Sequence, residues 1–289
     1  MLLKTRVDQR DNPAVASDLH ERIASRLRSL RTGDGFGPAA GSSPEPEPTA
    51  LATIALDDQA GRRWLADHQS ADGGFGIRAG TVVNDSATGL AALALQPGDA
   101  RERALDNLVS TPATRLPFNP DAPHDPTTRG WAWTAGTFGW VEPTARAVLA
   151  LRLLRPGATA PIADGVAMLE DRQCDDGGWN YGNAVVLGDR LPSYGQTTAV
   201  ALLALQGDPR MATDRGVGAL RTRSREERGG LTLATSLAAL RLLDTASAVA
   251  VESALEDEFE RSWLMDDVVV LSWAAIATGP GIEWLRWSP

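Results

Sequence analysis

Segments rich in Ala and Leu recur along the chain, and all but the last follow a glycine-rich turn. The two sharpest turns are 69–75 and 173–179, which share the pattern Gln-x-x-Asp-Gly-Gly-aromatic and lead into the apolar segments 85–95 and 196–205. Ala and Leu favour helix, and small side chains let neighbouring helices approach closely. The pattern therefore predicts hairpins, each with an outer helix before the turn and an inner helix after it.

The same unit recurs with weaker turns at 33–37, 136–140 and 228–231, and a sixth apolar segment covers 266–277. A threonine recurs at one phase of the inner segments: Thr49, Thr88, Thr144, Thr198 and Thr235. Repeated helical hairpins bury their apolar faces by stacking on their neighbours. We therefore predict an all-α fold, an α6/α6 toroid in which six hairpins close into a ring. An open solenoid is the alternative, but it needs polar end caps and a more even repeat.

The pattern also divides the chain. Residues 1–17 lack helical periodicity and form a predicted flexible tail, and residues 18–289 form a single toroid domain. Residues 112–140 hold five prolines and make a long irregular loop. Loops of that length in compact domains are usually functional, so we predict a loop insertion over the cavity mouth.

Composition narrows the partners. The net charge of −9 argues against nucleic acid as a partner. One cysteine and three histidines allow no internal disulfide and leave few metal ligands, so we expect no metal and no cofactor. The first residues lack a signal-peptide apolar region, and no run reaches the roughly 20 apolar residues that span a bilayer. These features predict a cytoplasmic protein, and the oligomeric state stays open.

The Gln-to-aromatic turns with Asp-Gly-Gly resemble the QW repeats of squalene–hopene and related terpenoid cyclases, and those of protein prenyltransferase β subunits. The resemblance covers about Asp18 to Trp287 and implies an α6/α6 barrel with ligands in a central cavity. It implies cyclisation initiated by an Asp-x-Asp-Asp acid or zinc-dependent prenyl transfer, but this chain departs from both patterns. No Asp-x-Asp-Asp occurs in it, and Cys174 lies in an outer turn with no histidine at the phase of a zinc ligand.

Residues at the N-terminal ends of the inner helices are expected to converge on one mouth of the ring. They are Glu47, Asp85, Glu142, Tyr194, Gln196, Asp266 and Asp267. From these we select Glu142 first as a candidate catalytic acid, then Asp267, Asp266 and Glu47. Each has a structural alternative, because carboxylates complement the helix dipole and Asp caps helices. For Glu142, an ion pair with Arg146 one turn later adequately explains that arginine.

A second candidate set is aromatic and polar, and would bind substrate near the same mouth. It consists of Trp131, Trp133, Phe138, Trp140, Tyr181, Tyr194, Asn180 and Arg129. Electron-rich rings stabilise cations, and an arginine can bind an anionic head group. Ordinary packing is the alternative for each aromatic, and for Asn180 a role in tying the helix entrance together.

The sequence thus predicts a terpene cyclase-like protein that protonates an isoprenoid or similar apolar ligand and so starts cyclisation or isomerisation. A non-catalytic binding or interaction toroid and a carbohydrate-active toroid are the alternatives. The C-terminal Trp284 and Trp287 either pack on the ring or make a peripheral membrane contact.

Overall fold

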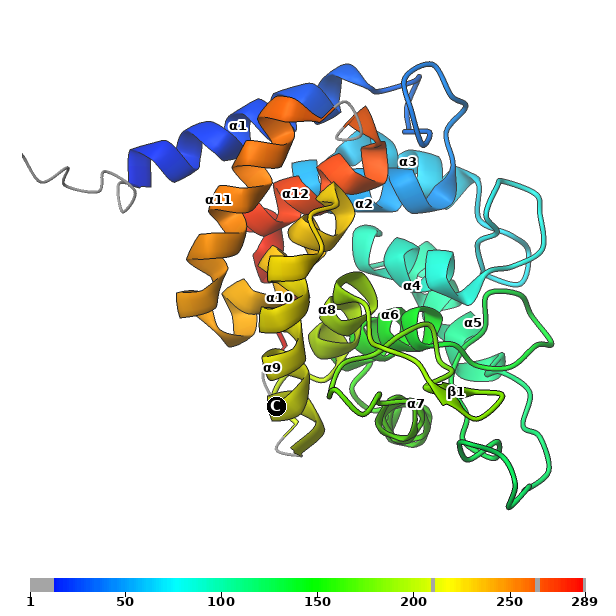
Figure 1. Ribbon diagram of the computed structural model, residues 1–289. Coiled ribbons are helices and arrows are strands. Elements are labelled where there is room, and N and C mark those ends of the chain that lie inside the picture. Colours follow the sequence, from blue (N-terminus) through cyan, green and yellow to red (C-terminus); the bar gives the residue numbers. More distant parts are fainter. Residues whose placement is uncertain (1–12, 209–210, 263–265, 288–289) are drawn as a thin grey trace, which may run out of the picture.

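The computed structural model describes residues 13–208, 211–262 and 266–287, and this part of the chain is mostly helical (Figure 1). Its inner helices are α2 (Pro46–Leu56), α4 (Asp85–Ala94), α6 (Val141–Leu154), α8 (Gly195–Ala204), α10 (Gly230–Leu243) and α12 (Val268–Thr278). Its outer helices are α1 (Pro13–Ser29), α3 (Gln59–Asp67), α5 (Asp99–Ser110), α7 (Thr159–Asp171), α9 (Met211–Glu226) and α11 (Thr245–Arg261). A two-residue hairpin, β1 (Val185–Val186) and β2 (Asp189–Arg190), and a short 3₁₀ helix, η3 (Pro280–Leu285), complete the elements.

The inner helices form a closed ring. Each contacts the next inner helix along the chain, and α12 contacts α2, which closes the circle. Each outer helix from α3 to α11 packs mainly on the inner helix that precedes it, while α1 packs on α12. The first hairpin therefore seals the joint between the two ends of the ring. The predicted all-α toroid is confirmed, and the open solenoid is excluded.

Burial explains why the inner segments are so uniformly apolar. All ten residues of α4 are buried, and α8 and α12 are buried over most of their length. A helix that is apolar on every side can be stable only with neighbours all round. Gly89 shows how close those neighbours come, because a Cβ there would lie 3.0 Å from the carbonyl carbon of Arg146. The small side chains of the inner segments are a condition of the ring's tight packing.

In the first four repeats the recurrent threonine joins the turn to its inner helix. Thr88 Oγ1 accepts a hydrogen bond of 3.0 Å from the backbone N–H of Phe75, and Thr198 Oγ1 accepts one of 2.9 Å from Trp179. Thr49 and Thr144 do the same for Phe36 and Trp131, each at 2.9 Å. Buried N–H groups must be paired, so this side chain fixes the aromatic of the turn.

The glutamine of the turn closes it from the other side. Gln69 Nε2 donates to the carbonyl oxygens of Gly73 and of Ala100, both at 2.8 Å. Gln173 Nε2 donates to Gly177 at 2.7 Å, and its Oε1 accepts from Arg215 on α9. The amide thus ties its own turn to the following outer helix.

The third turn lies earlier than the sequence predicted. Residues 136–140 were expected to be its equivalent, but Trp131 makes the bonds to Thr144 that Phe75 makes to Thr88. The aromatic and the threonine are 13 residues apart here, as they are in the first two repeats, whereas they are 19 apart in the fourth. The spacing from Gln to aromatic could not identify this turn, because the third repeat lacks the glutamine.

The boundaries also need adjustment. Helix α1 begins at Pro13, before the predicted end of the tail at residue 17, and residues 1–12 lie outside the described part of the chain. The loop 112–140 is irregular as predicted, but its bonds run to α7: Asp125 N donates to Asp171, and Arg115 pairs with Asp164 at 3.2 Å. One part of the loop therefore lies against α7, while Ala132 near its end reaches Asp85 at the start of α4.

At the C-terminus both tryptophans pack against arginines. Trp284 lies 5.7 Å from the Arg62 guanidinium and Trp287 lies 4.5 Å from that of Arg152. Gln206 fixes the segment through bonds to the carbonyl of Leu285 and the N–H of Trp287. Within the described residues, none of the helices has the length and apolarity needed to cross a bilayer.

Candidate functional site

A buried polar cluster connects three inner helices near their N-terminal ends. Arg146 on α6 donates 2.7 Å hydrogen bonds to Glu47 Oε1 on α2 and to Ser86 Oγ on α4, and it also pairs with Glu142 one turn earlier. Arg146 is 4% exposed and Glu142 is 5% exposed. The predicted ion pair with Glu142 is present, but it is only part of a contact that joins α2, α4 and α6.

The guanidinium of Arg146 therefore forms ion pairs with two carboxylates, those of Glu47 and Glu142. Burial raises the pKa of Glu142, with Arg146 acting against the shift and Glu47 acting with it. The Glu47 side chain remains 30% exposed and forms the outer edge of the cluster. Arg146 Nε is buried and donates no hydrogen bond within the described residues. The sequence analysis predicted that Glu47 and Glu142 lie at the same end of the ring, and their shared contact with Arg146 shows that they are neighbours.

Asp85 is a second buried acid of this region whose pKa is raised. It is the first residue of α4 and 1% exposed, and burial raises its pKa to about 6. Its Oδ2 accepts a 2.8 Å hydrogen bond from the N–H of Ala132, while Oδ1 is buried without a partner among the described residues. Its neighbour Ser86 binds Arg146, so the acid adjoins the cluster.

The sequence analysis placed Asp85 at this mouth but did not select it as an acid. A signal was available in the preceding residue. Asn84 caps α4 by accepting a hydrogen bond from Ala87 N, so Asp85 is not needed as the cap. When an Asp follows a good capping residue and begins a wholly buried helix, its side chain is expected to be buried as well.

Asp266 and Asp267 have other roles, and their selection as candidate acids is corrected. Asp267 caps α12, accepting from Val269 N at 2.8 Å and Val270 N at 3.1 Å. Asp266 is exposed and pairs with Arg26 of α1, which lowers the pKa of Asp266. An exposed carboxyl with a depressed pKa is ionised at neutral pH and cannot supply a proton.

The tryptophans of the 131–140 segment separate into different environments. Trp131 is 1% exposed and donates its indole N–H to the carbonyl of Leu108 at 2.8 Å, as Trp179 donates to Leu169. It is a packing residue of the turn, so its assignment to ligand binding is corrected. Trp133 is half-buried, and Trp140 is the N-cap residue directly before α6.

Trp140 and the exposed Phe138 line a cleft of about 230 Å³ between the 112–140 loop and α7. Arg129 is not with them. It lines a different hollow, with Val109, Pro161 and Asp164, between the ends of α5 and α7. Its assignment to the mouth is therefore corrected.

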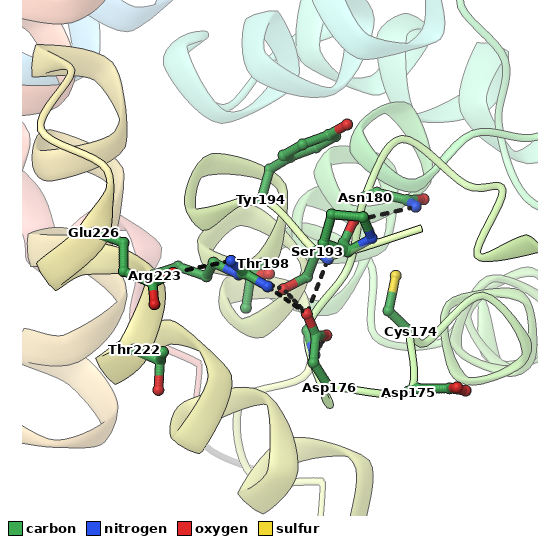
Figure 2. Close-up of polar contacts among 12 residues, drawn as sticks. Cys174, Asp175, Asp176, Asn180, Ser193, Tyr194, Thr198, Thr222, Arg223 and Glu226 are labelled. Atoms are coloured by element: carbon green, nitrogen blue, oxygen red, sulfur yellow. Dashed lines mark hydrogen bonds and ion pairs between the residues drawn. The ribbon is translucent and has the colours of Figure 1, made fainter. Parts of the chain in front are cut away.

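Tyr181 and Tyr194 form an exposed pair where α6 and α8 begin. Their rings are 5.3 Å apart, and the backbone of Tyr181 accepts from Val141 N, the first residue of α6. Figure 2 shows Tyr194 pointing away from the polar contacts of the fourth turn. Both rings are 39% exposed or more and remain free to contact a ligand.

Asn180 ties the turn together instead of facing a ligand, and this assignment is corrected. It is 3% exposed, donates to Asn183 O at 2.9 Å, and accepts from the backbone of Gly182 and Asn183. Nearby, Asp176 accepts from Ser193 and from Arg223 of α9 (Figure 2). Burial raises the pKa of the neighbouring Cys174 thiol to about 11, so it is not a thiolate nucleophile.

Solved structures with a similar fold include type II terpene cyclases. A variant of MstE from Scytonema, in complex with its substrate geranylgeranyl dihydroxybenzoate, aligns with a TM-score of 0.62 at 12% identity, over 93% of this chain and 97% of that chain. Ligand-free MstE aligns with a TM-score of 0.59 at 14% identity, over 91% and 98%. A protein from Actinoplanes aligns with a TM-score of 0.58 at 13% identity, over 93% and 99%. No family model and no curated protein matches the sequence.

The closed ring of inner helices, with the outer helices packed around it, defines the fold class: the chain is an α6/α6 toroid. Within that class its fold is the terpenoid cyclase-like one, as the glycine-rich turns indicated.

Proposed function

We propose that this toroid protonates the isoprenoid part of an apolar substrate and so initiates its cyclisation or isomerisation, with Asp85 as the acid. The observation that carries the proposal is the state of Asp85. A pKa of about 6 leaves a fraction of this carboxyl protonated near neutral pH, and its Oδ1 has no partner among the described residues. The N–H of Ala132 binds the other oxygen, which leaves Oδ1 to carry and donate the proton.

Asp85 replaces Glu142 as the first choice because of their partners. Glu142 is paired with Arg146, and an adjacent cation favours the ionised form of a carboxyl. In this account Arg146 and its partners form a rigid charged cluster beside the acid and do not donate the proton. Tyr181 and Tyr194, together with the half-buried Trp133, supply π-faces that can stabilise a developing cation.

The neighbours support an isoprenoid as the substrate class. MstE has been captured with geranylgeranyl dihydroxybenzoate as substrate and with merosterolic acid A as product. A related ligand for this chain is a proposal from fold likeness, since function is not fixed by fold.

Product mass spectrometry tests the proposal. Purified protein is incubated separately with squalene, farnesyl diphosphate, geranylgeranyl diphosphate and geranylgeranyl dihydroxybenzoate. We expect an isomer of unchanged mass from at least one substrate, abolished by Asp85→Asn and retained by Asp266→Asn, which alters only the surface pair with Arg26.

Two results would count against this account. A product that survives in Asp85→Asn but disappears in Glu142→Gln would move the acid to Glu142. No turnover of any of the four by the folded protein would make the non-catalytic binding toroid the better reading.

A further inference from the structure

The cleft between the 112–140 loop and α7 is lined by groups that the proposed reaction does not use. Its apolar walls are formed by Leu116, Pro126, Phe138, Trp140 and Met168. Its polar groups include Thr114, Thr128, His124, Asn183 and Arg172. None of the residues of the polar cluster around Arg146 lines this cleft, so the cleft is a separate space.

Arg172 is the unusual member. It is 7% exposed, yet the only partner of its guanidinium among the described residues is Asp171, with 3.5 Å between Nε and Oδ2. Its Nε is buried and donates no hydrogen bond there. A buried arginine normally has its fork of N–H donors filled, because an unpaired buried charge is costly. Arg172 therefore presents unused donors to the cleft.

The neighbouring charges limit what those donors can bind. Asp171 is held by the loop, since both its oxygens accept from Asp125 N at 3.1 Å. Asp125 and Asp171 together act to keep the guanidinium charged against burial, and His124, whose pKa burial lowers, is neutral at pH 7. With two carboxylates nearby, a ligand that carries two negative charges is disfavoured. A planar group with one negative charge matches the guanidinium fork best.

We propose that this cleft binds a small apolar carboxylate, with the carboxylate on Arg172 and an aromatic or other flat body against Phe138, Trp140 and Met168. The volume of about 230 Å³ is below that of most drug-sized sites and suits a body of one or two fused rings. The site does not depend on the proposed acid chemistry, and its failure would leave that chemistry untouched.

Calorimetric titration with 2-naphthoate tests the proposal, with 2-(hydroxymethyl)naphthalene as a neutral analogue of similar shape and 2-naphthyl phosphate as the doubly charged one. We expect naphthoate to bind at least about tenfold more tightly than either analogue, since hydrogen bonds to a charged group contribute on this scale. Arg172→Gln is expected to remove this preference. Arg115→Gln, on the same loop but paired with Asp164 away from the cleft, is expected to keep it.

A second variant guards against misfolding of Arg172→Gln. Phe138 is 52% exposed, so Phe138→Ala leaves the core intact and is expected to weaken naphthoate and the alcohol by similar factors. The proposal is overturned if the wild-type protein does not bind naphthoate, if the alcohol or the phosphate binds equally well, or if naphthoate binds a folded Arg172→Gln variant with wild-type affinity.

Discussion

At the residue scale, the informative feature is how differently the charged side chains near the ring are paired. Arg146 is buried and shared by two carboxylates on different helices, whereas Arg26 and Asp266 form one exposed pair. Asp85 is buried, and among the residues that the structure describes it forms no ion pair. The acids of these three situations look alike in the sequence, because Glu142, Asp266 and Asp85 each lie near the start of an inner helix.

The Asp85 carboxyl makes stability depend on pH. Its pKa rises from 3.8 to about 6 on folding, so its contribution is fully present below pH 3.8 and is lost as pH rises through about 6. At neutral pH the loss is of order 3 kcal/mol. Asp85→Asn cannot ionise, so its stability relative to wild type should increase between about pH 4 and pH 7. Urea unfolding at several pH values measures this, and a difference that does not vary with pH would contradict it.

Arg146 and Arg26 offer a comparison of buried and exposed pairing. Arg146→Gln leaves Glu47 and Glu142 without their cation and should cost about 3–5 kcal/mol. Arg26→Gln removes an exposed pair and should cost no more than about 1 kcal/mol. Denaturant unfolding of both variants gives the two values. Similar values would mean that Arg146 does not hold the three helices together.

At the element scale, the turns carry the regularity of the fold. The Gln-x-x-Asp-Gly-Gly-aromatic pattern and the threonine phase predicted the hairpins, and hydrogen bonds now explain both. The third turn was misplaced because its repeat lacks the glutamine, although the 13-residue spacing from Trp131 to Thr144, shared with the first two repeats, was a signal for it. Ala132 then bonds Asp85 across repeats, a contact between residues far apart in sequence that no local pattern encodes.

The threonine contact can be tested by comparing two repeats. Thr198→Val leaves the buried N–H of Trp179 without its partner and should cost about 1–3 kcal/mol. Thr235, at the same phase in the fifth repeat, bonds only to carbonyls of its own helix, Leu231 and Thr232. Thr235→Val should therefore cost distinctly less in the same denaturant assay. Equal losses would show that the hydroxyl matters only within its own helix.

The glycines of the turn allow a similar comparison. Gly177 (φ +92) and Gly188 (φ +89) share one backbone conformation, but a Cβ at Gly177 would lie 2.8 Å from Arg215 O while Gly188 has nothing within 4 Å. Both Ala variants bear the cost of positive φ, and only Gly177→Ala adds a clash with backbone. The melting temperature of Gly177→Ala should therefore fall further than that of Gly188→Ala. Equal falls would mean that α9 shifts away from the added Cβ at little cost.

At the scale of the whole molecule, closure of the ring brings the acids together. The sequence predicted the toroid and placed Glu47, Asp85 and Glu142 at one mouth, because the inner helices run parallel. The sequence could not show which of them is the best proton donor. That depends on how deeply each carboxyl is buried and on which groups bond to it. The sequence analysis assigned the Trp-rich segment to substrate binding as one set, because burial is not visible in the sequence. In the structure Trp131 packs in a turn and Trp140 lines a cleft beside α7.

The most direct test of the central claim is to run the reaction in D₂O with a substrate that the wild-type protein converts. If a buried acid protonates carbon to start the reaction, the product must gain one non-exchangeable deuterium that the same reaction in H₂O does not give, and Asp85→Asn must give no product. A product without deuterium at carbon would contradict protonation as the initiating step, whatever the fold resembles.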